Sequence, residues 1–86
     1  MPKRKDPRYK TLRIVINAGG IKSFRDLFKV VPRSVVAGDL GTNNNRFYKL
    51  ILNPGELKFN EAQAISRLIG CKYSVIRDLI EKELEP

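Results

Sequence analysis

Three consecutive asparagines stand near the middle of the chain, in the stretch "DLGTNNNRFYKL". Asparagine is a poor helix former, and a single amide suffices to cap a helix or to complete a turn. The amide of Asn43, Asn44 or Asn45 carries a donor and an acceptor, which together can bond N6 and N7 of an adenine. Arg46 and Lys49 follow, and their cationic groups can bond a phosphate or a guanine. These residue types therefore indicate recognition of nucleic acid.

Residues that could break or form covalent bonds are scarce. The chain contains no histidine and a single cysteine, Cys71. These counts exclude a Ser/His or Cys/His nucleophile pair and an internal disulfide, and a zinc site would have to be built from carboxylates and one thiol. We therefore expect no enzymatic activity, no metal site, no cofactor and no small-molecule ligand. Cys71 itself, directly after Gly70, is expected to be a small buried apolar residue.

The positive charge is concentrated in the first two thirds of the chain. Residues 1–10 carry five Lys/Arg and one Asp (+4), residues 11–55 carry seven and two (+5), and residues 56–86 carry five and six (−1), which gives the net +8. A basic portion of this kind favours an anionic partner, and nucleic acid is the leading candidate. An anionic membrane surface is the alternative, but the basic "MPKRKDPR" lacks the large apolar residues of a membrane-surface helix, so no membrane partner is expected.

Size and composition indicate one small globular domain. A chain of 86 residues, of which 42% are hydrophobic and 30% charged, has room for a single core and enough apolar side chains to form it. No apolar run approaches the roughly 18 residues that span a bilayer, and the N-terminus leads into no signal-peptide core. We therefore expect an intracellular, cytoplasmic protein.

The first eight residues combine two prolines and five charges with almost no apolar side chain. We expect residues 1–8 to form a flexible basic arm and residues 9–86 to form the domain. The arm is either a solubilising tail or a segment whose Lys3, Arg4 and Lys5 reach phosphates or an adjacent minor groove.

Apolar spacing and capping residues predict short helices along the domain. "YKTLRIVINAGG" suits a helix that ends at a glycine pair, although its β-branched "RIVI" would equally suit a strand. "SFRDLFKVV" predicts a helix over about residues 23–30, in which Ser23 and Asp26 form a capping box. Pro32 ends this helix or opens the next one.

More helices are expected in the second half of the chain. "PRSVVAGDLG" and "NNNRFYKLI" predict two short helices, the second of them capped by Thr42. "EAQAISRLIG" follows a turn at "NPG" and is expected to be capped by Asn60 with Gln63, and "YSVIRDLIEKEL" predicts a terminal helix. Because no strand pair with a hairpin signal is present, we predict an all-α fold, a compact bundle of five or six short helices.

Small and apolar residues join the two middle helices at a specific spacing. Ala37 is expected where the helices cross closely, and Gly41 can adopt the left-handed conformation that a sharp turn demands. Phe47 and Leu50 then hold the second helix against the first through burial of their side chains. This spacing predicts a helix-turn-helix over residues 33–51.

The chain resembles the lambda-repressor-like helix-turn-helix proteins, also called the XRE family, over about residues 21–80. The resemblance rests on "SVVAGDLGTNNNRFYKLI", on the turn that follows and on "FNEAQAISRLIGCKYSVIRDLI". It implies sequence-specific binding of double-stranded operator DNA by a transcriptional regulator, often a dimer on a palindromic site. The helix over residues 43–51 would then read the major groove.

The resemblance also implies roles for individual residues. The base-reading face corresponds to Asn43, Asn44, Asn45 and Lys49, and the phosphate-contacting positions correspond to Arg33 and Ser34. Arg46 and Tyr48 lie on the same helix and are expected to bond phosphates, with packing as the alternative for Tyr48.

The terminal helix carries apolar residues on more than one face, namely Val75, Ile76, Leu79, Ile80 and Leu84. A surplus apolar strip on a terminal helix can pair two subunits, so we expect a homodimer.

Two other functions remain as alternatives to DNA binding. The first is a protein-interaction module, antitoxin-like or adaptor, because a fold does not fix a function. The second is binding of single-stranded RNA, which is less favoured because at least three of the seven aromatic residues are expected to be buried.

Overall fold

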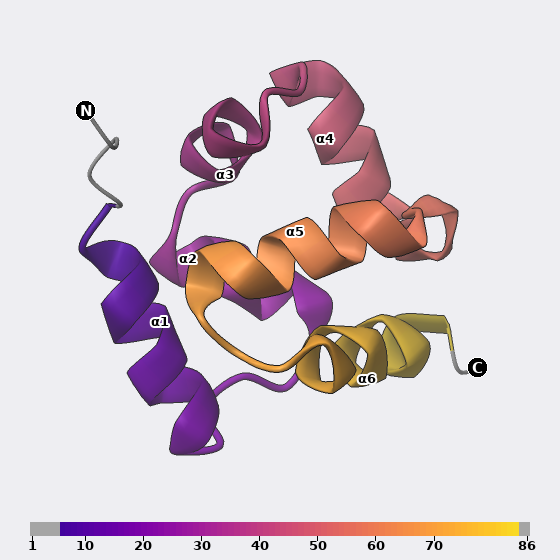
Figure 1. Ribbon diagram of the computed structural model, residues 1–86. Helices are drawn as coiled ribbons and strands as arrows, with labels where there is room; N and C mark the ends of the chain where they lie inside the picture. Colours follow the sequence, from indigo (N-terminus) through magenta and orange to yellow (C-terminus); the bar gives the residue numbers. More distant parts are fainter. Residues whose placement is uncertain (1–5, 85–86) are drawn as a thin grey trace.

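The computed structural model describes residues 6–84, which form helices and no strand. In chain order the elements are α1 (Arg8–Asn17), the 3-10 turn η1 (Phe24–Asp26), α2 (Leu27–Val30), α3 (Arg33–Leu40), α4 (Asn44–Leu52), the 3-10 turn η2 (Pro54–Glu56), α5 (Phe59–Ile69) and α6 (Tyr73–Leu84) (Figure 1). The predicted all-α class is therefore confirmed for these residues, and six α-helices are present among them. The predicted phosphate-binding residues Lys3, Arg4 and Lys5 lie outside the described residues.

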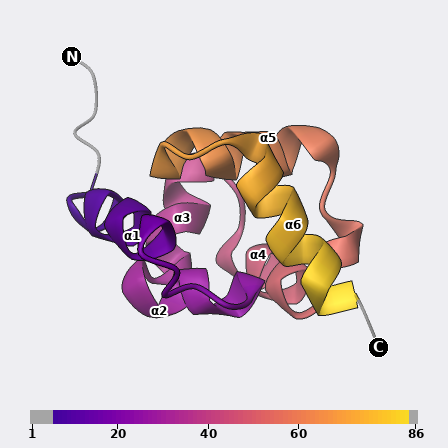
Figure 2. The same ribbon diagram turned by 90° about the horizontal axis from the view of Figure 1, so that it is seen from below.

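A single core lies between the helices, and α5 crosses its centre against α1, α3 and α6. Its largest fully buried side chains include Phe24, Phe47 and Ile65. Phe28 joins α2 to α4 because its ring meets Phe24 edge-on at 5.3 Å and Phe47 edge-on at 5.5 Å between ring centroids. Such edge-to-face pairs stabilise a core beyond the area that they bury. In Figure 2, α1 and the C-terminal end of α6 lie on opposite sides of this core.

The N-terminal segment with the β-branched "RIVI" is a helix, α1, and not a strand. Tyr9 and Leu12 bury its inner face, and the Tyr9 hydroxyl donates a hydrogen bond of 2.7 Å to Oδ2 of Asp39 on α3. The helix begins at Arg8, whose backbone N–H donates to Asp6 Oδ1 at 2.9 Å. Hydrogen bonds from Arg8 also lower the pKa of Asp6 to about 2. Arg8 is therefore the first residue of α1, and the Asp6 carboxylate holds it from just before the helix.

The capping box at the start of the second helical segment is confirmed. Oδ2 of Asp26 accepts from the backbone N–H groups of Lys22 at 3.0 Å and Ser23 at 3.2 Å. The bond from Lys22, and next the ion pair with Lys29 at 3.2 Å, lower the pKa of Asp26. The first turn of this segment is 3-10 and continues into α2, so the predicted helix over residues 23–30 consists of two short pieces.

The two middle helices are joined by a tight turn, as predicted. Gly41 ends α3 in the left-handed conformation with φ 71°, and the N–H of Thr42 donates to the carbonyl of Ala37 at 2.9 Å. Ala37 is 1% exposed, in agreement with its predicted place at the close crossing of the helices. The prediction that Thr42 caps α4 is wrong. Asn43 is the cap, because its extended backbone allows Oδ1 to accept from the N–H groups of Asn45 at 2.8 Å and Arg46 at 3.2 Å.

The predicted cap of α5 is also wrong. The helix begins at Phe59, so Asn60 lies inside its first turn and Lys58 occupies the cap position. Oε1 of Glu61 accepts from the backbone N–H of Lys58 at 3.0 Å, because a carboxylate three residues after the cap reaches that donor. Gly70 ends α5 with φ 86°, as expected from the sequence.

The apolar strip of α6 is largely used inside the molecule. Ile76 and Leu79 belong to the core, and Val75 and Ile80 are half-buried. Leu84 is 59% exposed and lies beside Gly55 of η2. The homodimer stays a prediction, but it loses most of the surface from which the sequence predicted it. None of the helices within residues 6–84 is long and apolar enough to cross a membrane.

Candidate nucleic-acid interface

The outer face of α4 carries the residues predicted to read bases. Successive residues of a helix are rotated by about 100°, so the buried stripe of Phe47, Leu50 and Ile51 places Asn45 and Lys49 on the opposite side. Asn44, Asn45, Tyr48 and Lys49 are all exposed. The first turn of α4 contains no acidic residue. The structure thus brings Asn45 and Lys49 onto the outer face of α4, whereas Asn44 is exposed in the first turn on the flank that also carries Tyr48.

The fourth predicted base-reading residue, Asn43, has a structural task. Its Oδ1 accepts two backbone hydrogen bonds and holds the first turn of α4. A bidentate bond to adenine requires both the oxygen and the nitrogen of an amide. While the cap is formed, Asn43 therefore cannot make that bond, and it positions Asn44 and Asn45 instead.

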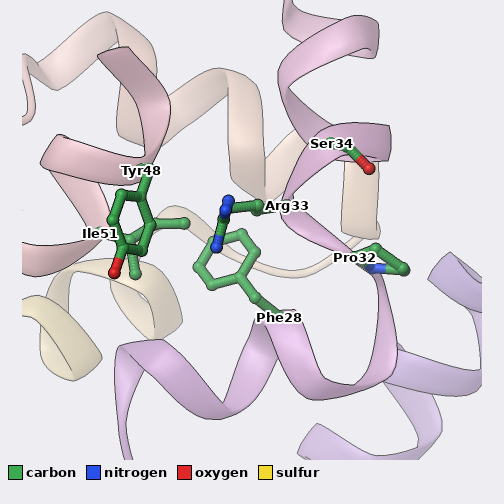
Figure 3. A pocket seen from close by; sticks show the side chains of 6 residues that line it. All are labelled: Phe28, Pro32, Arg33, Ser34, Tyr48 and Ile51. Carbon is green, nitrogen blue, oxygen red and sulfur yellow. The ribbon is translucent and has the colours of Figure 1, made fainter. Parts of the chain in front are cut away.

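One flank of α4 faces the first turn of α3. The guanidinium carbon of Arg33 lies 4.1 Å from the centroid of the Tyr48 ring, a cation–π contact. Figure 3 shows the Arg33 side chain pointing toward Tyr48, whereas the hydroxyl of Ser34 points away from both. Arg33 and Tyr48 are thus in contact, whereas Ser34 lines the same groove with its hydroxyl turned away. The groove around them has a volume of about 360 Å³ and an apolar floor that includes Phe28 and Ile51.

The other flank of α4 faces the start of α5. Nη1 of Arg46 donates to Oε2 of Glu61 at 2.9 Å and to Oγ1 of Thr42 at 3.2 Å. Glu61 also accepts from the N–H of Lys58, and these contacts lower its pKa, with the bond from Lys58 as the largest cause. The predicted phosphate ligand Arg46 is therefore half-exposed and already holds an anionic partner within the protein.

Sequence reasoning missed two polar contacts that hold the candidate interface. One is the ion pair of Arg46 with Glu61, and the other is the hydrogen bond of Tyr9 with Asp39, which joins α1 to α3. No sequence pattern indicates either contact, because each depends on how two helices are oriented relative to one another. The capping-box spacing from Lys58 to Glu61 could have indicated the place of the carboxylate.

Within residues 6–84, no group of three or more His, Cys, Asp or Glu side chains is arranged to hold a metal ion. Cys71 is half-buried, and burial raises the pKa of its thiol. Neither observation adds a reactive centre to the surface of α4.

No model of a known protein family, no curated protein and no solved structure matches the chain. The function must therefore be argued from the surface of α3 and α4.

Proposed function

We propose that the protein binds double-stranded DNA in a sequence-specific way and acts as a transcriptional regulator. In this proposal α3 and α4 form a helix-turn-helix of the lambda-repressor-like (XRE) type, and α4 enters the major groove. The observation that carries the proposal is the outer face of Asn45 and Lys49, with Asn44 exposed in the first turn, on a helix that the Gly41 turn fixes against α3. A rigid helix with amides and a cation on its outer face is suited to base edges.

The dimensions of the DNA major groove support the placement of α4 in it. A helix with its side chains is about 10–12 Å wide, close to the width of about 12 Å of the B-DNA major groove. The outer face would then meet base edges, and the two flanks would meet the two phosphate backbones. Tyr48 and Arg46 lie about 80° to either side of the centre of the outer face, at about 100° per residue. Arg33 with Tyr48 would thus approach one backbone, and Arg46 the other.

The roles differ among the residues. Asn44 and Asn45 read bases, adenine most favourably, and Lys49 bonds a guanine or a phosphate. Arg33, Arg46 and Tyr48 contact phosphates, and Asn43 acts through the position of its neighbours. Phosphate contacts by Ser34 and by the arm residues Lys3, Arg4 and Lys5 stay predictions from the sequence, as do the cytoplasmic location and the pairing of two copies on a palindromic site.

A gel-shift titration with random duplexes over a range of salt concentrations tests the proposal. Each phosphate contact should contribute about −0.9 to the slope of log affinity against log salt. Lys49→Ala or Arg33→Ala should weaken binding to every sequence and reduce that slope by about 1. If no complex is retained at physiological salt, the proposal is wrong.

A protein-interaction module is the second candidate. Phe59, at the start of α5, is 62% exposed, and its ring lies 4.8 Å from that of Tyr73 between centroids. Tyr73 is partly buried against the core, and an exposed aromatic ring such as that of Phe59 is typical of a protein-binding surface. The same gel shift separates DNA binding from protein interaction, because a protein that binds only other proteins retains no duplex.

A further inference from the structure

Glu61 is held at both of its carboxylate oxygens beside the flank of α4. Oε1 accepts from the backbone N–H of Lys58 at 3.0 Å, and Oε2 accepts from Nη1 of Arg46 at 2.9 Å. The Glu61 side chain is 22% exposed and that of Arg46 is 49% exposed. The carboxylate is therefore fixed to α5 by the backbone, while the guanidinium keeps access to solvent.

We propose that Glu61 restrains Arg46 and thereby limits the binding of non-specific DNA. Resting on the proposed DNA-binding function, this inference assigns Arg46 a phosphate contact that forms only when its guanidinium leaves Glu61. Glu61 is then a specificity-determining residue that touches no base.

The acceptors that compete for Arg46 are chemically alike. A carboxylate and a phosphate both bind a guanidinium through charge-assisted hydrogen bonds. An exposed ion pair favours its own formation by a factor of only about 1.4 to 5, so a closely seated phosphate can replace Glu61. A loosely bound duplex, whose phosphates approach less closely, replaces it less often.

Glu61 does not follow Arg46 when the pair opens. The hydrogen bond from Lys58 keeps the carboxylate in place, so its negative charge then faces the incoming phosphate. Lys49 differs, because no ion pair with an acidic residue is found for it within residues 6–84. Lys49 therefore attracts any duplex, whereas Arg46 adds affinity only in a complex that fits closely.

The variant Glu61→Gln tests this inference. Glutamine retains an oxygen for the N–H of Lys58 but has no charge to hold Arg46. Affinity for random duplexes should rise by up to about 5-fold, the most that release from such an ion pair can give, and the salt slope should steepen by about 0.9, the value of one phosphate contact. Affinity for the preferred site should rise less, so the ratio of specific to non-specific affinity should fall.

Glu81→Gln is the matched control. Glu81 lies on α6, pairs with Arg77 at 4.0 Å, and its substitution removes the same charge from the protein. It should change the affinity for random duplexes by less than about 2-fold, as expected for a net-charge effect alone. In an Arg46→Ala background, Glu61→Gln should no longer steepen the salt slope, because the phosphate contact of Arg46 is absent.

Three results would overturn the inference. The two glutamine variants raise affinity equally, Glu61→Gln lowers affinity, or Glu61→Gln still steepens the salt slope without Arg46. If Glu61→Gln fails to fold in a thermal melt, Arg46→Ala decides instead: it should weaken binding to random duplexes less than Lys49→Ala does, and an equal or larger loss refutes the restraint. Failure of the proposed DNA-binding function differs from failure of this inference, because the wild-type protein itself would then retain no duplex.

Discussion

The guanidinium of Arg33, in the first turn of α3, lies over the ring of Tyr48 on α4, with 4.1 Å between the guanidinium carbon and the ring centroid. This contact joins the two helices on the side opposite to the ion pair of Arg46 with Glu61. The outer face of α4 is therefore held along both flanks by an arginine. Each of these arginines has its position set by another side chain of the protein, which reduces the ordering needed when a ligand binds.

The first prediction concerns the Tyr48 ring. Tyr48→Ala should lower the free energy of unfolding by about 0.5–1 kcal/mol, because the cation–π contact with Arg33 is lost. Tyr48→Phe keeps the ring and should stay close to the wild type. Urea denaturation measures both variants, and equal losses would show that the hydroxyl, not the ring, supports the helix pair.

The second prediction compares two glycines near the end of α3, one inside the helix and one that ends it. Gly41 has φ 71°, where a side chain is strained, so Gly41→Ala should destabilise the fold by about 1–2 kcal/mol. Gly38 lies inside α3, and a Cβ added there meets no atom within 4 Å. Gly38→Ala should therefore stabilise the fold by about 0.5–1 kcal/mol. Thermal melts of the two variants should shift in opposite directions, and a shift in the same direction contradicts this assignment of the turn.

The third prediction separates capping from base reading at Asn43. Asn43→Ala should cost about 1 kcal/mol, because two backbone donors lose their acceptor. Asn43→Asp keeps the acceptor and places a negative charge at the positive end of α4, so stability should be retained. The same aspartate should weaken DNA binding through repulsion of phosphates. Denaturation and gel shifts of both variants measure these effects, and a loss of stability in Asn43→Asp would mean that the cap is not the main role.

The fourth prediction concerns pH and the contact of Tyr9 with Asp39. Burial, and next the hydrogen bond to Asp39, raise the pKa of Tyr9 above its usual value of 10.0. Above that pH the unfolded chain loses the Tyr9 proton while the folded protein keeps it, so the folded state binds more protons. Stability should therefore fall as pH rises, by up to about 1.4 kcal/mol per pH unit.

Tyr9→Phe isolates this effect from other groups that titrate at high pH. At neutral pH the variant should lose about 0.5–1.5 kcal/mol with the hydrogen bond. The difference in unfolding free energy between the wild type and Tyr9→Phe should shrink as pH rises above about 10. A difference that stays constant to about pH 11 would place the Tyr9 hydroxyl in contact with water.

Much of the fold could be predicted because its signals are local. Apolar spacing predicted the burial of Phe47 and Leu50, and Gly41 marked a helix end that needs a left-handed residue. The N-terminal caps of α4 and α5 were predicted at the wrong residues, and both errors have the same cause. Several residues near a helix start can cap it, and the choice depends on backbone angles, as at Asn43, that composition does not determine.

The candidate interface was predictable in outline but not in its contacts. Helical periodicity placed Asn45 and Lys49 on one face, because it needs only the 100° rotation per residue, but it places Asn44 on the flank. The partners of Arg46 and Tyr9 lie 15 and 30 residues away along the chain. Such pairs depend on how α5 and α1 pack against the middle helices, which no local pattern specifies.

The central claim is that the amides of α4 read bases, and selection of bound sites from a random duplex pool tests it most directly. The wild-type protein should select one preferred sequence. Asn44→Ala and Asn45→Ala should each relax the preference at a base position and cost about 1–3 kcal/mol there, and Asn17→Ala, on the exposed end of α1, should leave it unchanged. A pool without sequence preference, or a preference that both α4 variants retain, would contradict the claim.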